Sequence, residues 1–138
     1  MKPSEKSLTG TVKADVKLNG NPFKFSSTSM QWKVENRWHH FTFIHDENTS
    51  LEIITASEIK VGYYQFGLAE NPVDIYYSTF TDGRHRRTKL IRGGCEVTQT
   101  VPFNDGTLPA RAEFQGNGTG VGVTVEVLDG AKLNIALT

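Results

Sequence analysis

Residues 103–137 read FNDGTLPARAEFQGNGTGVGVTVEVLDGAKLNIAL. Three Asp-Gly or Asn-Gly pairs recur in this stretch, at Asp105-Gly106, Asn117-Gly118 and Asp129-Gly130. Such pairs readily adopt the positive φ angles that two-residue hairpin turns require. Between the pairs, apolar residues alternate with polar residues or glycine, as they do in half-buried strands. The stretch therefore predicts short antiparallel strands joined by tight turns.

The same turn signals extend through the rest of the chain. They stand at Gly93-Gly94, Asp82-Gly83, Glu70-Asn71-Pro72, residues 57–62, residues 45–50, Glu35-Asn36-Arg37 and Asn19-Gly20-Asn21. No segment favours a helix, because the best candidate, residues 48–60, has a β-branched run typical of a strand followed by a turn. We therefore predict an all-β fold, an antiparallel meander of about 10–11 short strands that forms a two-layer sandwich or a flattened barrel.

Length and charge narrow the class of protein. The chain has 138 residues, which suits one domain spanning residues 1–138, with residues 1–7 expected to be flexible. Lys plus Arg equals Asp plus Glu, 15 each, and this balance argues against a protein dedicated to nucleic acid. No apolar run suits a signal peptide or a membrane span. We expect a soluble cytoplasmic protein, or a periplasmic or cell-surface one if an export signal was removed.

Neither a metal site nor a cofactor site is predicted. Cys95 is the single cysteine, and its place on a core-facing position predicts a buried, inert thiol. His39 and His40 point to opposite faces of a strand, and His45 lies too far along it to share an ion with His39. The glycines are accounted for by turns, and no glycine-rich phosphate loop precedes a helix.

No catalytic residue is predicted either. The sequence has no G-x-S-x-G elbow and no arrangement of Ser, His and Asp that the turns would bring together. Strand alternation places the carboxylates Asp74, Glu96, Glu113 and Glu126 on the outer faces, where carboxylates are ordinarily solvated.

Residues 79–94, TFTDGRHRRTKLIRGG, hold four of the six arginines. If Asp82-Gly83 is a two-residue turn, the pairing follows by counting, and paired residues share a face. The pairs are Thr81 with Arg84, Phe80 with His85, Thr79 with Arg86, Ser78 with Arg87, Tyr77 with Thr88, Tyr76 with Lys89 and Ile75 with Leu90. Arg84 and Arg86 then continue the core side beyond Tyr77, whereas Arg87 and Lys89 occupy the outer side, with Lys89 able to lie over Tyr76.

Two arrangements of this basic hairpin (residues 81–92) are open. Either its tip overhangs the core into water, which we expect, or Arg84 and Arg86 turn into a polar cavity that needs an anion or carboxylates. Of the aromatic residues between 23 and 43, most are expected in the core, while Trp32 and Trp38 flank a turn and are expected to be exposed. The predicted ligand- or partner-binding residues are Arg84, Arg86, Arg87, Tyr77, Trp32 and Trp38.

The second half of the chain resembles a known group of domains. The segments that carry the resemblance are VGYYQFG (61–67), LIRGGCEVTQ (90–99), FNDGTLPARAEFQG (103–116) and GVTVEVLDGAKLNIAL (122–137). They resemble small bacterial all-β domains of unknown function that are often attached to exported lipoproteins. The sequence departs from that pattern at Arg111 and Ala112, and by lacking a visible export signal. The resemblance implies a β-sandwich over residues 60–137 and carries over no catalytic residue.

These observations favour a non-enzymatic module that binds an anionic ligand or a protein partner through the basic hairpin and exposed aromatics. One alternative is a small enzyme in which Arg86 and Tyr77 orient an acidic small molecule in an internal cavity. The other is a structural subunit that self-associates through its edge strands.

Overall fold

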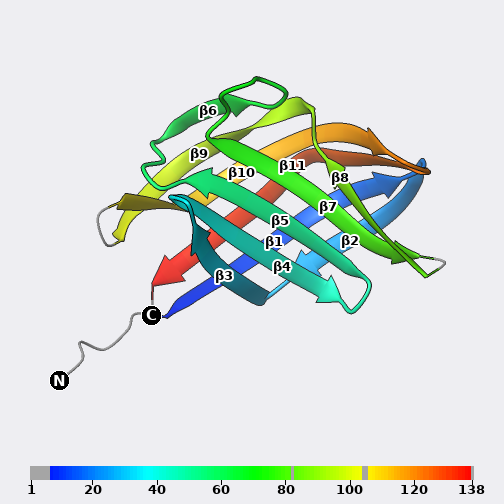
Figure 1. Cartoon of the computed structure of the whole chain (residues 1–138), viewed down its shortest axis with the longest axis horizontal. Coiled ribbons are helices and arrows are strands. Elements are labelled where there is room, and N and C mark those ends of the chain that lie inside the picture. The colour runs from blue at the N-terminus through cyan, green and yellow to red at the C-terminus, as the bar shows by residue number, and fades with distance from the viewer. Residues whose placement is uncertain (1–6, 82, 104–105, 138) are drawn as a thin grey trace.

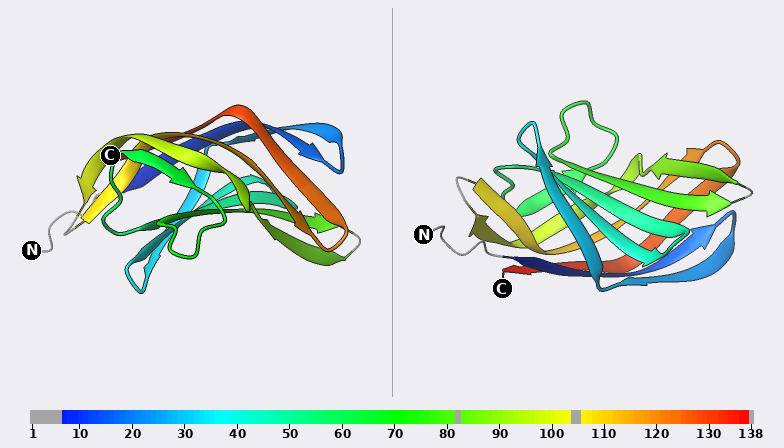
Figure 2. Two further views of the ribbon diagram at one scale, coloured as in Figure 1. Left: turned by 90° about the horizontal axis from the view of Figure 1, so that it is seen from above. Right: turned by 60° about the horizontal axis from the view of Figure 1, so that its bottom comes forward.

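The structure is a computed structural model, which describes residues 7–81, 83–103 and 106–137. Eleven strands form two antiparallel sheets of six and five strands, with no helix in these residues. The sheets pack face to face as a two-layer β-sandwich and do not close into a barrel (Figures 1 and 2). The predicted all-β fold is confirmed, and of the two predicted architectures the structure is the sandwich.

The six-stranded sheet has the order β2-β1-β11-β10-β9-β6. Its strands are β1 (Leu8–Leu18), β2 (Asn21–Ser27), β6 (Gly62–Gln65), β9 (Arg92–Phe103), β10 (Gly106–Gly120) and β11 (Val123–Leu137). The first and last strands are neighbours in its middle, with Leu8 opposite Leu137. Strand β6 leaves the chain order to pair with β9, where Tyr64 is opposite Cys95.

The five-stranded sheet has the order β3-β4-β5-β7-β8. Its strands are β3 (Ser29–Glu35), β4 (Trp38–Asp46), β5 (Thr49–Ala56), β7 (Val73–Thr81) and β8 (Arg84–Lys89). The chain passes between the sheets four times: from β2 to β3 at Thr28, from β5 to β6, from β6 to β7, and from β8 to β9 at Leu90 and Ile91. Segment 48–60 forms β5 and a turn, as the sequence predicts.

The core lies between the two sheets and is built from the inward side of each strand. Its largest buried side chains include Phe25, Phe41, Phe43, Tyr77 and Phe114. The predicted core role of most aromatic residues in the first third of the chain is therefore confirmed for three of these phenylalanines. Of the described residues, none lies in a helix that is long and apolar enough to cross a membrane.

Several predicted turns are confirmed by the backbone. Asn19-Gly20 and Asn36-Arg37 both have positive φ at two successive residues, as two-residue hairpin turns require. Glu47-Asn48 joins β4 to β5. The predicted turn residues Asp82 and Asp105 lie outside the described residues.

Three predicted turns are wrong, because their glycines lie inside strands. Asn117-Gly118 falls within β10, and the chain reverses instead at Val121-Gly122. Gly93-Gly94 opens β9. Asp129-Gly130 belongs to a bulge of β11, where the pairing with β10 shifts between Phe114 and Gly116 and the strand continues.

Three glycines of β10 and Gly122 of the β10–β11 turn instead serve the junction between the sheets. Gly116, Gly118, Gly120 and Gly122 stand at every second position and meet, in turn, the Arg92 carbonyl, the Lys89 carbonyl, the Thr88 hydroxyl and the Arg86 guanidinium. A Cβ atom at any of them would overlap with the neighbour named. This glycine stripe lets β8 and the start of β9 lie directly against β10, where the Ile91 N–H donates to the Asn117 carbonyl over 2.9 Å.

Candidate functional site: a pocket at one end of the sandwich

The basic hairpin has the register that the sequence predicts. Strand β7 pairs with β8 so that Thr79 is opposite Arg86, Ser78 opposite Arg87 and Tyr77 opposite Thr88. The Leu90 N–H continues the ladder by donating to the Ile75 carbonyl. The six predicted pairs from 76 to 81 are confirmed, and so is the separation of the hairpin's charges onto two faces.

On the outer face, the hairpin's charges are paired. The Arg87 guanidinium donates to the Glu52 carboxylate and lies 3.6 Å from the centroid of the Tyr76 ring. Lys89 Nζ lies 3.7 Å from Asp74 Oδ1, and it stands 6.0 Å from the Tyr76 centroid. Both cations therefore lie over Tyr76, as predicted for Lys89, and Arg87 is the closer of the two. Ion pairs of this kind are ordinary on a sheet surface.

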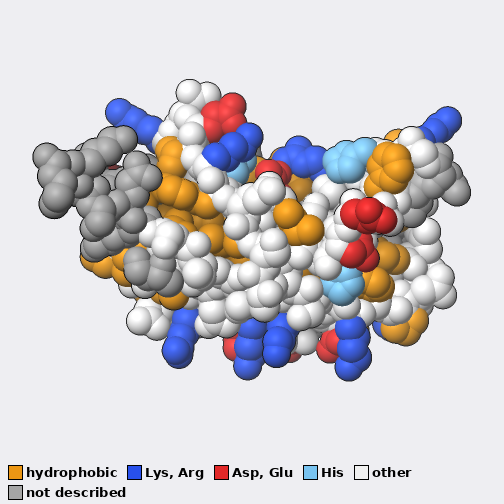
Figure 3. Space-filling model, turned by 90° about the horizontal axis from the view of Figure 1, so that it is seen from below, with side chains coloured by type: hydrophobic (Ala, Val, Ile, Leu, Met, Phe, Trp, Pro, Cys, Tyr) orange, Lys and Arg blue, Asp and Glu red, His pale blue; other side chains and the backbone are white. Residues whose placement is uncertain are grey.

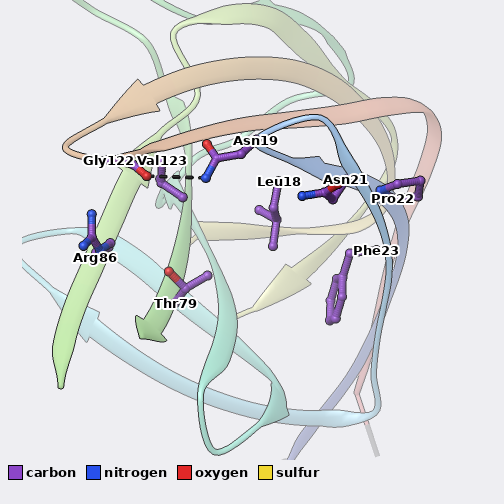
Figure 4. A pocket seen from close by; sticks show the side chains of 9 residues that line it. All are labelled: Leu18, Asn19, Asn21, Pro22, Phe23, Thr79, Arg86, Gly122 and Val123. Atoms are coloured by element: carbon purple, nitrogen blue, oxygen red, sulfur yellow. Dashed lines mark hydrogen bonds between the residues drawn. The ribbon is translucent and has the colours of Figure 1, made fainter. Parts of the chain in front are cut away.

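On the inner face, Arg86 turns toward the space between the sheets. It lines a pocket of about 410 Å³ at the end of the sandwich (Figure 4). The other lining residues are Leu18, Asn19, Asn21, Pro22, Phe23, Thr79, Gly122 and Val123. The expected overhang therefore fits Arg84, which is exposed, and does not fit Arg86. The reason is that the β10–β11 turn reaches beside the hairpin and gives Arg86 a carbonyl to bind.

Two hairpin turns and strand β8 hold the rim of the pocket together. The Arg86 guanidinium donates to the Val121 carbonyl, which links the five-stranded sheet to the six-stranded one. The Asn19 side-chain amide donates to the Gly122 carbonyl over 3.4 Å, and its oxygen accepts the Thr124 N–H over 2.8 Å. The polar groups of Asn19 are thus used within the protein, and they fix the β1–β2 turn against the β10–β11 turn.

Several buried polar groups without a hydrogen-bond partner lie close to the pocket. Within the described residues, buried side-chain atoms that lack a hydrogen-bond partner include Tyr77 Oη, Thr79 Oγ1, Thr88 Oγ1 and Arg86 Nε, which all lie on the inner face of one hairpin, and Thr55 Oγ1 on β5. Burial of a polar group without a partner costs free energy. Buried groups of this kind are ordinarily satisfied by ordered water, an ion or a ligand.

The Tyr77 phenol belongs to the same wall but not to the pocket lining. Only 1 % of it is exposed. Burial raises the pKa of Tyr77 well above its ordinary value, and the nearby Asp46 carboxylate adds to the shift. The phenol is therefore a neutral hydroxyl at physiological pH, held behind Thr79 rather than presented to solvent.

The two predicted tryptophans differ in their surroundings. Trp38 is 36 % exposed, as predicted. Trp32 is half-buried, because its ring packs edge-on against Phe103 and stacks with His39. Its indole N–H donates to His39 Nδ1 over 3.2 Å. Neither ring lines the pocket beside Arg86, so the structure does not bring the tryptophans and the arginines together.

The histidines and the cysteine take the places that strand alternation predicts. His39 is buried and His40 faces the opposite side, 3.8 Å from Glu52. In the described part of the chain no three His, Cys, Asp or Glu side chains are arranged to hold a metal ion. Cys95 is buried, and burial raises its pKa to about 12, with Glu96 adding to the shift.

Sequence reasoning missed Thr79, Asn19 and Gly122 as parts of the site. The hairpin register already places Thr79 beside Arg86, so this neighbour could have been found from the sequence. Asn19 and Gly122 could not, because they belong to the other sheet and no local pattern brings them to the hairpin.

Figure 3 views the molecule from below, and on this face the Lys and Arg side chains stand at several places, some of them following one another along the lower edge. Comparison with models of protein families, with curated proteins and with solved structures gives no match. The fold and the pocket thus define the chain as an all-β sandwich, and its resemblance to small bacterial all-β domains stays a prediction.

Proposed function

We propose that this β-sandwich is a binding module that holds a small anion in the pocket lined by Arg86. The proposal rests on one observation, the charge of Arg86 that lacks a carboxylate partner. Its guanidinium lies on the pocket wall and, among the described residues, pairs with no carboxylate. The neighbouring Arg87 has both a carboxylate and an aromatic ring.

The electrostatics support an anionic occupant. A guanidinium that is partly withdrawn from water loses hydration, and a carbonyl partner does not neutralise its charge. Val121 supplies only such a carbonyl. An anion that enters the pocket would provide the missing opposite charge, with the strong charge-assisted hydrogen bonds that guanidinium groups form with carboxylates.

The lining favours binding over chemistry. Its described residues contribute one cation, one hydroxyl, amides and apolar groups, and they include no carboxylate, imidazole or thiol that could act as a general acid or base. The enzyme alternative requires a carboxylate beside Arg86 and Tyr77, and this lining contains none. A volume of about 410 Å³ lies within the range of small-molecule pockets.

The test is a titration of isotope-labelled protein followed by nuclear magnetic resonance. Acetate, hexanoate and inorganic phosphate are added separately at fixed ionic strength. If the proposal holds, at least one anion shifts the backbone resonances of Thr79 and Arg86 and the side-chain Nε–H resonance of Arg86. Arg86→Gln abolishes the shifts and Arg84→Gln, with the same loss of charge on the same hairpin, keeps them. Shifts confined to the outer face, or equal in both variants, would contradict the proposal.

A further inference from the structure

The pocket has two walls of different chemistry. Arg86 and Thr79 come from the hairpin of the five-stranded sheet, and Leu18, Phe23 and Val123 come from the six-stranded sheet. In Figure 4, the Arg86 and Thr79 side chains lie on one side of the pocket, and Pro22 and Phe23 lie on the other. One wall therefore offers charge and a hydroxyl, and the facing wall offers mainly apolar surface beside the exposed amide of Asn21.

The polar wall has the capacity for a single small charged group. Arg86 is the one charged residue of the described lining, and one of its terminal nitrogens is already bound to Val121. Its Nε and the Thr79 hydroxyl remain without partners, and Thr79 is only 7 % exposed. The polar groups of Asn19 are engaged in holding the rim. One guanidinium with one hydroxyl matches the two oxygens and single charge of a carboxylate. A doubly charged phosphate would meet only one positive charge among the described lining residues.

The apolar wall requires the rest of the ligand to be hydrophobic. Leu18 and Phe23 pack against the core from its margin and keep part of their surface toward the pocket. A ligand that carried only a charge would leave this surface in contact with water, whereas an alkyl or aryl group would cover it. The side chains on the two walls come from different sheets, so a ligand that touches both must be amphipathic.

We infer that the pocket selects a monocarboxylate with an apolar body, with the carboxylate on Arg86 and Thr79 and the body on Leu18, Phe23 and Val123. This inference rests on the proposed function, because it names the class of anion that the same pocket takes. Selectivity comes from the apolar wall, and charge recognition comes from Arg86.

The experiment is a set of calorimetric titrations with acetate, butyrate, hexanoate, neutral hexanamide and inorganic phosphate. Burial of each methylene group strengthens binding about fourfold, so hexanoate is expected to bind at least tenfold more tightly than acetate. Hexanamide and phosphate are expected to bind at least tenfold more weakly than hexanoate. Arg86→Gln abolishes hexanoate binding, and Arg84→Gln leaves it unchanged.

A second variant protects the test against a failure of Arg86→Gln to fold. Thr79→Val keeps the shape of a buried side chain and removes only the hydroxyl, and it is expected to weaken hexanoate binding severalfold. Thr55→Val removes a similarly unpartnered hydroxyl on β5, outside the pocket lining, and is expected to leave binding unchanged.

The results distinguish a failure of the proposed ligand class from a failure of the anion-binding function. Acetate or phosphate binding as tightly as hexanoate, with dependence on Arg86, would overturn the amphipathic class and leave the anion-binding function in place. Hexanamide binding as tightly as hexanoate would overturn the role of the charge, and with it both statements. Both statements would also be overturned if none of the four anions binds the wild-type protein.

Discussion

The guanidinium of Arg86 donates a hydrogen bond to the carbonyl oxygen of Val121, 35 positions further along the chain. This bond joins the tip of the five-stranded sheet to a turn of the six-stranded sheet. It also aims the one cation among the described lining residues across the gap between them. The sandwich is therefore tied at this end by the same side chain that we propose to bind the ligand.

Gly118→Ala is expected to destabilise the protein strongly. A Cβ atom at position 118 would overlap with the Lys89 carbonyl, which is backbone and cannot rotate away. Overpacking of this kind costs about 1–3 kcal/mol, or more when the backbone must move. The free energy of unfolding in urea measures the effect, and Thr119→Ala, on the exposed side of the same strand, serves as the control with little change.

Thr79→Val is expected to stabilise the ligand-free protein by about 1 kcal/mol, because it removes a buried hydroxyl that has no partner in the described chain. Thr55→Val is expected to stabilise it similarly. Urea unfolding of the two variants and the wild type measures this. A loss of stability in Thr79→Val alone would show that its hydroxyl is already satisfied without a ligand.

His39 is expected to make the protein less stable in acid. Burial lowers the pKa of His39 below its ordinary value, and the neighbouring His40 adds to the shift. The unfolded chain therefore binds a proton below about pH 6.5 that the folded protein resists. Stability is full above that pH and falls as the pH drops toward the folded pKa. Unfolding curves at several pH values should show this fall, and His39→Gln should reduce it while His85→Gln, on an exposed residue, should not.

Cys95 is expected to be inert and to lower stability in strong base. Burial raises its pKa to about 12, so the folded protein keeps the thiol proton that the unfolded chain loses near pH 9. Its contribution is complete below that pH and is lost as the pH rises toward 12. Reaction with a thiol reagent at pH 8 should require unfolding. Rapid labelling of the native protein would contradict the buried position.

The comparison of sequence and structure shows where local patterns are sufficient. The β7–β8 register is confirmed pair by pair, because a two-residue turn fixes every following pair by counting. The turn predicted at Asn117-Gly118 was wrong. Residue type alone does not distinguish a glycine that a close neighbour requires from a glycine that a positive φ requires. The signal that separates them was present in the spacing of Gly116, Gly118, Gly120 and Gly122, which repeats with the period of a strand face.

The whole pocket could not be predicted from the sequence, for a different reason. Arg86 and Thr79 lie on one hairpin, and their proximity follows from its register. The wall formed by Leu18, Phe23 and Val123 depends on β1, β2 and β11 being neighbours. Nothing in those strands encodes which distant strand each will pair with, so only the half of the site that lies on the hairpin could be predicted.

The pairing of β1 with β11 also bears on how the protein is made. Strands β1 and β2 are synthesised before β11, yet the partner on the other side of β1 consists of residues 123–137. The early hairpin must therefore wait with an open edge while the rest of the chain is translated. The six-stranded sheet is therefore complete only when β11 has paired with β1, and until then the open edge of β1 can associate with other chains.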